Sequence, residues 1–175
     1  KFQRKLEKMA ITDSLTGLMN RQAFEYMFYQ WTAESKRTGQ PFSAALFDID
    51  LFKQINDVYG HLEGDQIIRE VAKLTQNMLR ACDVVVRWGG EEFLIMLKKC
   101  TLADAAAVAE KIRVQFENQR FAISQDESPI DIGVTISTGV AEYSIHETDV
   151  DFFARIDKAL YRAKKAGRNC VEISQ

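Results

Sequence analysis

Apolar and polar residues follow two spacings along this chain, and their order predicts helices that alternate with strands. Apolar side chains recur every three to four residues over several stretches, as they do in amphipathic helices. Asn20 and Gly167 stand at the ends of two such stretches, as helix caps do. The predicted helices are residues 20–37, 51–65 (a short helix and turn), 66–80, 101–117 and 149–167.

Short apolar runs between these helices predict the strands. The second and third of them flank a glycine turn and therefore predict a hairpin. The order of elements favours a mixed α/β (α+β) fold, in which helices pack on a largely antiparallel sheet. Residues 121–130 are expected to form a loop. The predicted strands are residues 41–50, 83–88, 92–97, 130–143 and 169–174.

The length of 175 residues is typical of a single domain. Residues 1–10, KFQRKLEKMA, place Phe2, Leu6 and Met9 on one face of a charged helix. One heptad fits either a helical terminus or the end of a signalling helix that forms a coiled coil. We expect residues 11–175 to form the main domain. Because the first residue is not methionine, we expect the chain to be part of a longer protein.

Charge and composition narrow the classes of function. A net charge of -2 and a pI of about 5.8 argue against binding DNA or RNA through a basic surface. No apolar run approaches the ~20 residues that span a bilayer, so we expect a cytoplasmic domain without direct membrane contact; the longer protein could be membrane-anchored. Three cysteines without CxxC spacing indicate reduced thiols. With only two histidines, a metal would be held by oxygen, which favours Mg²⁺ or Mn²⁺.

The stretch VVRWGGEEFLIML, residues 85–97, places carboxylates where a strand is expected. Acidic side chains are depleted in strands, yet Glu91 and Glu92 directly follow the glycine turn. Asp48 and Asp50 stand at the end of the first predicted strand. If these strands are neighbours, the acids converge, and a divalent cation would remove their repulsion. The alternative is that they are solvated strand ends.

Basic residues flank this cluster and favour a site for phosphates. Lys53 follows the acidic strand end, and Lys164, Lys165 and Arg168 lie near the end of the last helix. Cations at a helix C-terminus also complement its dipole, so a structural role stays open. The backbone N–H groups of residues 51–53 would add donors. The chain has no P-loop motif.

Five motifs occur in the order and spacing of a known family. FDIDLFKQINDVYGHLEGD, RWGGEEF, DSLTGLMNR, VTISTGVA and ALYRAKKAGRN resemble the motifs of the GGDEF-domain diguanylate cyclases. The resemblance covers about residues 11–173 and implies a palm-like nucleotidyl cyclase fold. Glu91 stands where the family usually has Asp, and Glu also occurs there in working members.

The resemblance implies a metal site and a general base. Asp48 and Glu91 would bind magnesium together with the carbonyl of Ile49, and Asp50 would either assist a second metal or position water. Glu92 would accept the proton of the ribose hydroxyl. The catalytic residues implied are therefore Glu91, Glu92 and Asp48.

The resemblance also implies a GTP site. A carboxylate at Asp65 accepts from both N1–H and N2–H of guanine, whereas adenine has no donor at N1. Two alternatives stay open: Asn56 as a helix-terminus residue, and Asp65 as the N-cap of the helix at 66–80. His61 is expected to be structural, hydrogen-bonded in a turn. The implied GTP-binding residues are Asn56, Asp65, Lys53, Lys164 and Arg168, the backbone amides of Leu51 and Phe52, and Gly89 and Gly90, which let the backbone approach the nucleotide.

A second constellation lies upstream of the glycine turn. In RACD, Arg80 and Asp83 stand where the family carries its product-binding inhibitory motif. Arginine offers a fork to the O6/N7 edge of guanine, and aspartate accepts from its N1–H and N2–H. Lys111 or Arg113 would add a further basic residue. The alternative is an arginine that ends a helix and an aspartate in a turn.

The function implied is condensation of two GTP molecules into cyclic di-GMP with release of two pyrophosphates. One domain binds one GTP, so catalysis requires a homodimer of facing domains, and cyclic di-GMP would also inhibit. An upstream sensory domain would control the pairing. Two alternatives are a non-catalytic receptor for GTP or cyclic di-GMP and a cyclase that makes another cyclic dinucleotide. The intact acidic motifs argue against the first alternative, and Asp65 argues against the second.

Overall fold

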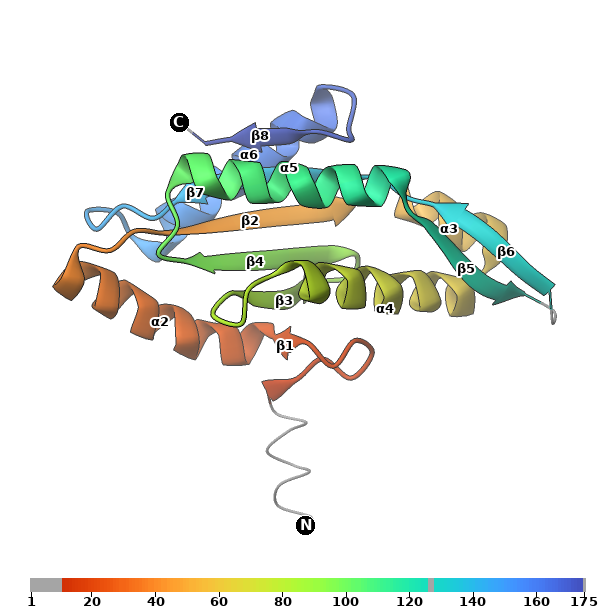
Figure 1. Ribbon diagram of the computed structural model, residues 1–175, viewed down its shortest axis with the longest axis horizontal. Helices are drawn as coiled ribbons and strands as arrows, with labels where there is room; N and C mark the ends of the chain where they lie inside the picture. The colour runs from red at the N-terminus through yellow and green to blue at the C-terminus, as the bar shows by residue number, and fades with distance from the viewer. Residues whose placement is uncertain (1–10, 126–127, 175) are drawn as a thin grey trace, which may run out of the picture.

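The computed structural model describes residues 11–125 and 128–174, in which a mixed sheet lies between two layers of helices (Figure 1). The helices are α2 (Arg21–Thr38), α3 (Phe52–Tyr59), α4 (His61–Met78), α5 (Leu102–Asn118) and α6 (Asp149–Lys165). The strands are β1 (Met19–Asn20), β2 (Phe42–Ile49), β3 (Val84–Gly89), β4 (Glu92–Lys98), β5 (Arg120–Gln125), β6 (Ser128–Gly133), β7 (Ile136–Glu142) and β8 (Val171–Ile173).

The main sheet has the strand order β1-β3-β4-β2-β7-β8. Its inner pairs are antiparallel, and only the edge strands β1 and β8 run parallel to their neighbours. This topology confirms the prediction of an α+β fold with a largely antiparallel sheet. No helix in the described part of the chain is long and apolar enough to cross a membrane.

β2 is a central strand, and all of its residues are buried. Ala45 and Phe47 belong to the core beneath α4 and α5, whereas Ala44 and Leu46 belong to the core beneath α2 and α6. Burial on both faces explains why this strand is a nearly continuous apolar run. Asp48 interrupts the run just where the strand ends.

Gly139 on β7 lets α6 approach the sheet closely. A Cβ at this position would collide with the backbone of α6, at the carbonyl oxygen of Ile156 and the nitrogen of Leu160. Glycine in a strand commonly marks such a close backbone approach. The contact fixes the height of α6 above the sheet, and with it the last turn of the helix, which carries Lys164.

Two predicted helix boundaries were wrong. α4 begins at His61 rather than at Gln66, so Asp65 lies inside the helix and is not its N-cap. α4 ends at Met78 with Leu79 as its C-cap, so Arg80 follows the helix rather than ending it. Gly64 had the appearance of a turn residue, but it is buried inside α4 because α3 packs directly against it.

The stretch around residues 120–143 also differs from the prediction. The expected loop at 121–130 is a hairpin of β5 and β6, and the expected single strand at 130–143 is divided between β6 and β7. Phe121 and Ile123 alternate toward the core, but this strand is short and the sequence that follows it is polar, so its pattern was not recognised. β1 is a further strand, in a segment where turn residues alone were expected.

Candidate active site

Two carboxylates lie opposite each other where β2 and β4 meet at one end of the sheet. The strand register pairs Asp48 with Glu92. The N–H of Ile49 donates to the carbonyl of Glu91 over 3.3 Å, which holds the glycine turn against the end of β2. Like charges in directly opposite positions destabilise an antiparallel pair. The convergence of these acids therefore requires a compensating cation.

Lys164, on the last turn of α6, supplies one positive charge. Its Nζ lies 3.0 Å from Oδ2 of Asp48. Burial raises the pKa of Asp48, the hydrogen bond and charge of Lys164 act in the opposite direction, and the charges of Glu91 and Asp50 raise it further. Burial and then the charge of Asp48 raise the pKa of Glu92. Because the pKa values of both carboxyl groups are raised overall, the single ammonium group of Lys164 does not fully compensate the cost of placing these negative charges together.

Asp50 has an environment that differs from the one expected of a residue assisting a metal. Its side chain is buried, and Oδ1 accepts from the hydroxyl of Ser137 over 2.6 Å. Oδ2 accepts from the hydroxyl of Thr135 over 2.7 Å and from the backbone N–H of Asn169 over 3.0 Å. Asp50 thus ties the end of β2 to β7 and to the loop after α6.

α3 begins directly after this strand end. Leu51 precedes the helix in the left-handed region, with φ 56°. The turn directs the first N–H groups of α3, which have no acceptor within the helix, out of its N-terminus. Lys53 is exposed in the first turn, and Phe52 is buried. Backbone donors and an exposed cation therefore follow directly after the strand end that carries the carboxylates.

Asn56 packs against α4 next to the turn that carries Asp65. A Cβ on Gly64 would collide with Oδ1 of Asn56 and would lie 3.2 Å from Cζ of Phe52. Asp65 is the next residue of α4 and is partly buried. The two residues expected to read guanine thus lie at the same α3–α4 junction. The ring of His61, expected to be hydrogen-bonded, is exposed and makes no hydrogen bond with the described residues.

A clamp that sequence reasoning did not assign holds the glycine turn. Arg87 donates from Nε and Nη2 to the carbonyl of Gly90 over 3.1 and 2.9 Å. Its Nη1 contacts both carboxylate oxygens of Asp13 over 3.1 Å. Burial acts to raise the pKa of Asp13, but hydrogen bonds from Thr16 and then Arg87 lower it. Asp13 and Arg87 lie in two of the quoted motifs, and only the fold reveals that they pair.

Arg80 and Asp83 form a turn between α4 and β3, in which the N–H of Asp83 donates to the carbonyl of Arg80 over 3.0 Å. Asp83 accepts from the backbone N–H groups of Arg80 and of Lys98, each over 3.2 Å. Both residues line an open hollow of about 360 Å³ that the segment Gly17–Met19 completes. The guanidinium of Arg80 is exposed and makes no hydrogen bond or ion pair with the described residues.

The structure does not direct Arg113 toward Arg80 and Asp83. Its guanidinium bonds to Glu110 and Glu117 on its own helix and to the side chain of Asn169, after α6. Residues two apart on a helix point in different directions. Lys111 is therefore the remaining candidate on α5, and it is exposed.

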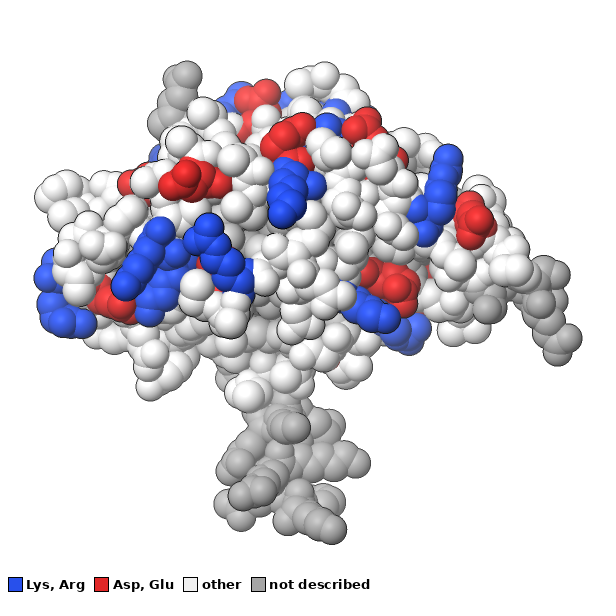
Figure 2. Space-filling view, viewed as in Figure 1, with Lys and Arg blue, Asp and Glu red and all other residues white. Residues whose placement is uncertain are grey.

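Charge and possible metal ligands were considered over the whole described part of the chain. On the face shown in Figure 2, basic and acidic side chains are interspersed rather than separated into broad areas of one sign. Among the described residues, no group of three or more acidic, histidine or cysteine side chains is arranged to hold a metal by itself. A cation at the acidic end would therefore need further oxygen ligands.

The sequence and the fold both match known proteins. Residues 10–170 match the family described as diguanylate cyclase, GGDEF domain. The diguanylate cyclase DgcM of Escherichia coli K12 is 38% identical over 171 residues, which are 98% of this chain and 40% of DgcM. The chain thus spans less than half the length of this relative.

Two solved structures share the arrangement of elements. The coiled coil and GGDEF domain of DgcB from Caulobacter crescentus, in complex with c-di-GMP, has a TM-score of 0.91 at 32% identity and covers 99% of this chain and 90% of that one. The active GGEEF domain of a diguanylate cyclase from Vibrio cholerae has a TM-score of 0.81 at 35% identity, covering 90% of this chain and 98% of that one. The chain therefore belongs to the GGDEF-domain family.

Proposed function

We propose that this domain is a diguanylate cyclase, which condenses two GTP molecules into cyclic di-GMP and releases two pyrophosphates. The observation that carries this proposal is the convergence at one end of the sheet. Asp48 and Glu92 are paired in register, Lys164 lies 3.0 Å from Asp48, and α3 begins where β2 ends. The Vibrio relative supports it, because its active domain has the GGEEF motif that residues 89–93 have here.

The donors at this end fit Mg²⁺ or Mn²⁺. Mg²⁺ is usually held by one or two carboxylates and completed by water and substrate phosphates, which agrees with a site that has too few side-chain ligands alone. We assign Asp48, Glu91 and the carbonyl of Ile49 to the cation. When bound, it would favour ionisation of the ribose 3′-hydroxyl and neutralise charge on the α-phosphate. Asp50 is assigned to holding the adjacent loop instead.

Glu92 is assigned as the acceptor of the ribose proton. A base is more effective when its pKa lies closer to the working pH, and burial with the charge of Asp48 raises the pKa of Glu92. Lys53, Lys164 and Arg168 would hold the triphosphate together with the first N–H groups of α3. Asn56 and Asp65 would bind guanine at the α3–α4 junction.

The reaction requires two copies of this site. Each GTP supplies a 3′-hydroxyl to the α-phosphate of the other, so two domains must face each other around a two-fold axis. The rate per domain should consequently rise with protein concentration until the dimer is saturated. A constant rate per domain across a wide dilution series, with the protein monomeric by light scattering, would contradict the facing-domain mechanism.

Arg80 and Asp83 are assigned to inhibition by the product. The hollow beside them is open and lies apart from the acidic end, and Arg80 has a free fork for a guanine edge. Lys111 would add charge without a fork. Arg80→Ala should keep the initial rate and give linear progress curves where the wild type slows. Equal slowing of both proteins would mean that the product competes for the GTP site.

The remaining assignments concern the longer protein. Because DgcM extends well beyond the matched region, we propose that an upstream sensory domain controls the pairing, and that the catalytic domain acts in the cytoplasm, where GTP is available. Residues 1–10, the expected end of a signalling helix, lie outside the described residues.

A further inference from the structure

The loop between α6 and β8 holds an unusual backbone conformation. Gly167, Arg168 and Asn169 have φ values of 112°, 66° and 48°, so three consecutive residues have positive φ. Glycine adopts this region freely and asparagine tolerates it, but arginine rarely does. A strained segment of this kind persists only where its surroundings hold it in place. The question is what holds it.

Asn169 is the residue through which the loop is fixed. Its backbone N–H donates to Oδ2 of Asp50 over 3.0 Å. Its side-chain oxygen accepts from Nη1 of Arg113 over 2.8 Å, and its side-chain nitrogen donates to Glu117 over 2.8 Å. The loop is therefore tied on one side to the acidic end of the sheet and on the other to α5.

Arg113 is itself held rigidly. Its guanidinium makes hydrogen bonds of 2.9 to 3.1 Å with Glu110 and of 3.0 Å with Glu117, and its side chain is only 12% exposed. Hydrogen bonds to Asn169 and then Arg113 lower the pKa of Glu117. Such a planar, multiply bonded fork has little freedom left. Arg113 and Glu117 thus form a fixed platform for Asn169.

Arg168 precedes Asn169 in this loop, and only its backbone is held. Its backbone N–H donates to the carbonyl of Ala163 over 3.1 Å. Its side chain is exposed and makes no hydrogen bond or ion pair with the described residues. The neighbours of Arg168 are thus fixed, while its guanidinium is left available to a ligand.

We propose that Arg113, acting through Asn169, is a positioning residue that sets the place of Arg168 for the triphosphate. This inference rests on the proposed function, because it takes the triphosphate to lie beside Lys164 and Arg168. It gives Arg113 a role in substrate binding, in place of the product-binding role expected from the sequence. Neither Arg113 nor Asn169 touches the substrate in this account.

The test compares two probes in the presence of Mg²⁺: a non-hydrolysable α,β-methylene analogue of GTP, and guanosine, which lacks phosphates. Arg113→Ala should weaken binding of the analogue about tenfold, as expected for a misplaced charge-assisted contact. Guanosine binding should be unchanged, since Asn56 and Asp65 lie on α3 and α4. Arg162→Ala is the matched control, because the side chain of Arg162 contacts Glu172 and the carbonyl of Ile173 on β8 and none of residues 166–170.

A double-mutant cycle separates positioning from general destabilisation. If Arg113 acts through Arg168, adding Arg113→Ala to Arg168→Ala should cause little further loss of analogue affinity. Additive losses, or an equal loss for guanosine, would overturn the inference. If Arg113→Ala fails to fold, Asn169→Gly takes its place, because it permits positive φ and removes only the ties to α5.

Failure of the proposed function would look different. If the wild type does not bind the analogue at all, the proposed function itself is contradicted. If Arg168→Ala binds the analogue as tightly as the wild type, the triphosphate does not lie beside Arg168, and both the assignment of Arg168 and the positioning role of Arg113 fall. If Arg168→Ala loses affinity but Arg113→Ala and Asn169→Gly do not, only the positioning role is wrong.

Discussion

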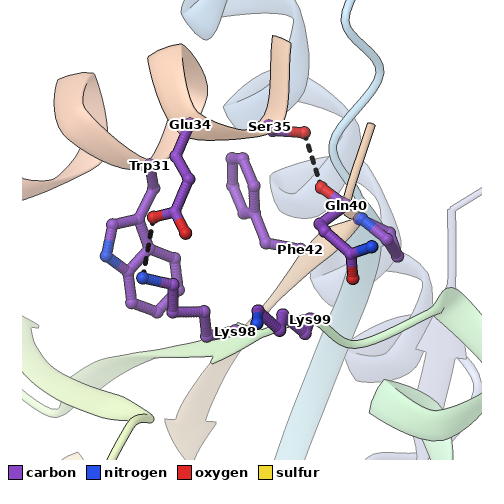
Figure 3. Close-up of a pocket in the computed structure, with 8 residues that line it drawn as sticks. Trp31, Glu34, Ser35, Gln40, Phe42, Lys98 and Lys99 are labelled. Carbon is purple, nitrogen blue, oxygen red and sulfur yellow. Dashed lines mark hydrogen bonds and ion pairs between the residues drawn. The ribbon is translucent and has the colours of Figure 1, made fainter. Parts of the chain in front are cut away.

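Opposite charges lie together at one end of the β2–β4 pair, and like charges lie together at the other. At the end where Phe42 pairs with Lys98, Nζ of Lys98 lies 2.7 Å from Glu34 and 5.6 Å from the ring centre of Trp31. Figure 3 shows this ion pair beside a hollow with a volume of only about 10 Å³. At the other end, Asp48 pairs with Glu92, and the nearby charges are mostly of the same sign.

The difference shows that charge stabilises the fold at one end of the pair and opposes it at the other. The end at Lys98 joins opposite charges over aromatic rings, and Phe42 stacks on Tyr143 with ring centres 4.8 Å apart. The end at Asp48 holds carboxylates whose repulsion opposes folding. The ion pair between Asp48 and Lys164 offsets this repulsion only in part, so we infer that a bound ligand compensates the rest.

The largest effect is expected from removing an acid at the end where Asp48 pairs with Glu92. Asp48→Ala or Glu91→Ala removes a negative oxygen ligand and should lower synthesis of cyclic di-GMP at least about 100-fold, or about 2.7 kcal/mol of transition-state stabilisation. The unfolding transition should be retained, because the acids repel one another. Glu34→Ala, at the opposite end, is the matched control and should keep turnover. A variant that keeps more than about a tenth of wild-type turnover would refute the metal assignment.

A smaller loss is expected at the α3–α4 junction. Asp65→Ala removes a charge-assisted pair to guanine and should weaken GTP binding by about 1.5–3 kcal/mol. Calorimetry with GTP and ATP would measure the change. Unchanged GTP affinity, or equal competition by ATP in the wild type, would show that Asp65 does not read the base.

The pH dependence of stability should reflect the strained carboxylates. In the folded protein the pKa of Asp48 is raised above 3.8 and that of Glu92 above 4.5. Between these ordinary values and the raised ones, the folded protein binds more protons than the unfolded chain. Their contribution to stability is therefore present at low pH and is lost as pH rises through the raised pKa values. Denaturant unfolding would measure the free energy of unfolding of the metal-free wild type and of Glu92→Gln. As pH rises through this range, the variant should become increasingly more stable than the wild type. A difference that is independent of pH would contradict the shift at Glu92.

The smallest effect is expected at the opposite end. Lys98→Ala removes an ion pair that is about one-third exposed on each side, and solvent-exposed pairs of this kind contribute little to stability. Loss of its contact with Trp31 adds to this. Thermal unfolding should shift slightly while GTP turnover stays unchanged. A loss of turnover comparable to that of Glu91→Ala would mean that the two ends are coupled.

Sequence reasoning recovered the parts of this molecule that local pattern determines. β2 was predictable because it is apolar on both faces, and the hairpin because a glycine turn separates two apolar runs. The acids were predictable as a group, because they interrupt buried strands. The β5–β6 hairpin was missed because β5 is short and the sequence that follows it is polar. The start of α4 was predicted too late, because only the packing of α3 makes Gly64 acceptable within a helix.

Local sequence patterns could not identify residues whose partners are distant in the sequence. Arg87 and Asp13 are 74 positions apart, and neither has a local feature that indicates the other. In the sequence, nothing distinguishes Arg113 from other arginines in helices. Only the fold shows that it bonds to Asn169, 56 positions later. Asp50 follows the same strand end as Asp48, yet its oxygens accept from Thr135, Ser137 and Asn169, all more than 80 positions away in the sequence.

The most direct test of the central claim is to identify what the concentrated domain makes from GTP and Mg²⁺. We predict that chromatography will show cyclic di-GMP and that two pyrophosphates will be released for each molecule formed. ATP in place of GTP should give no cyclic dinucleotide. Absence of turnover at every concentration that yields the dimer, or release of pyrophosphate without cyclic di-GMP, would contradict the assignment of the acidic end as a diguanylate cyclase site.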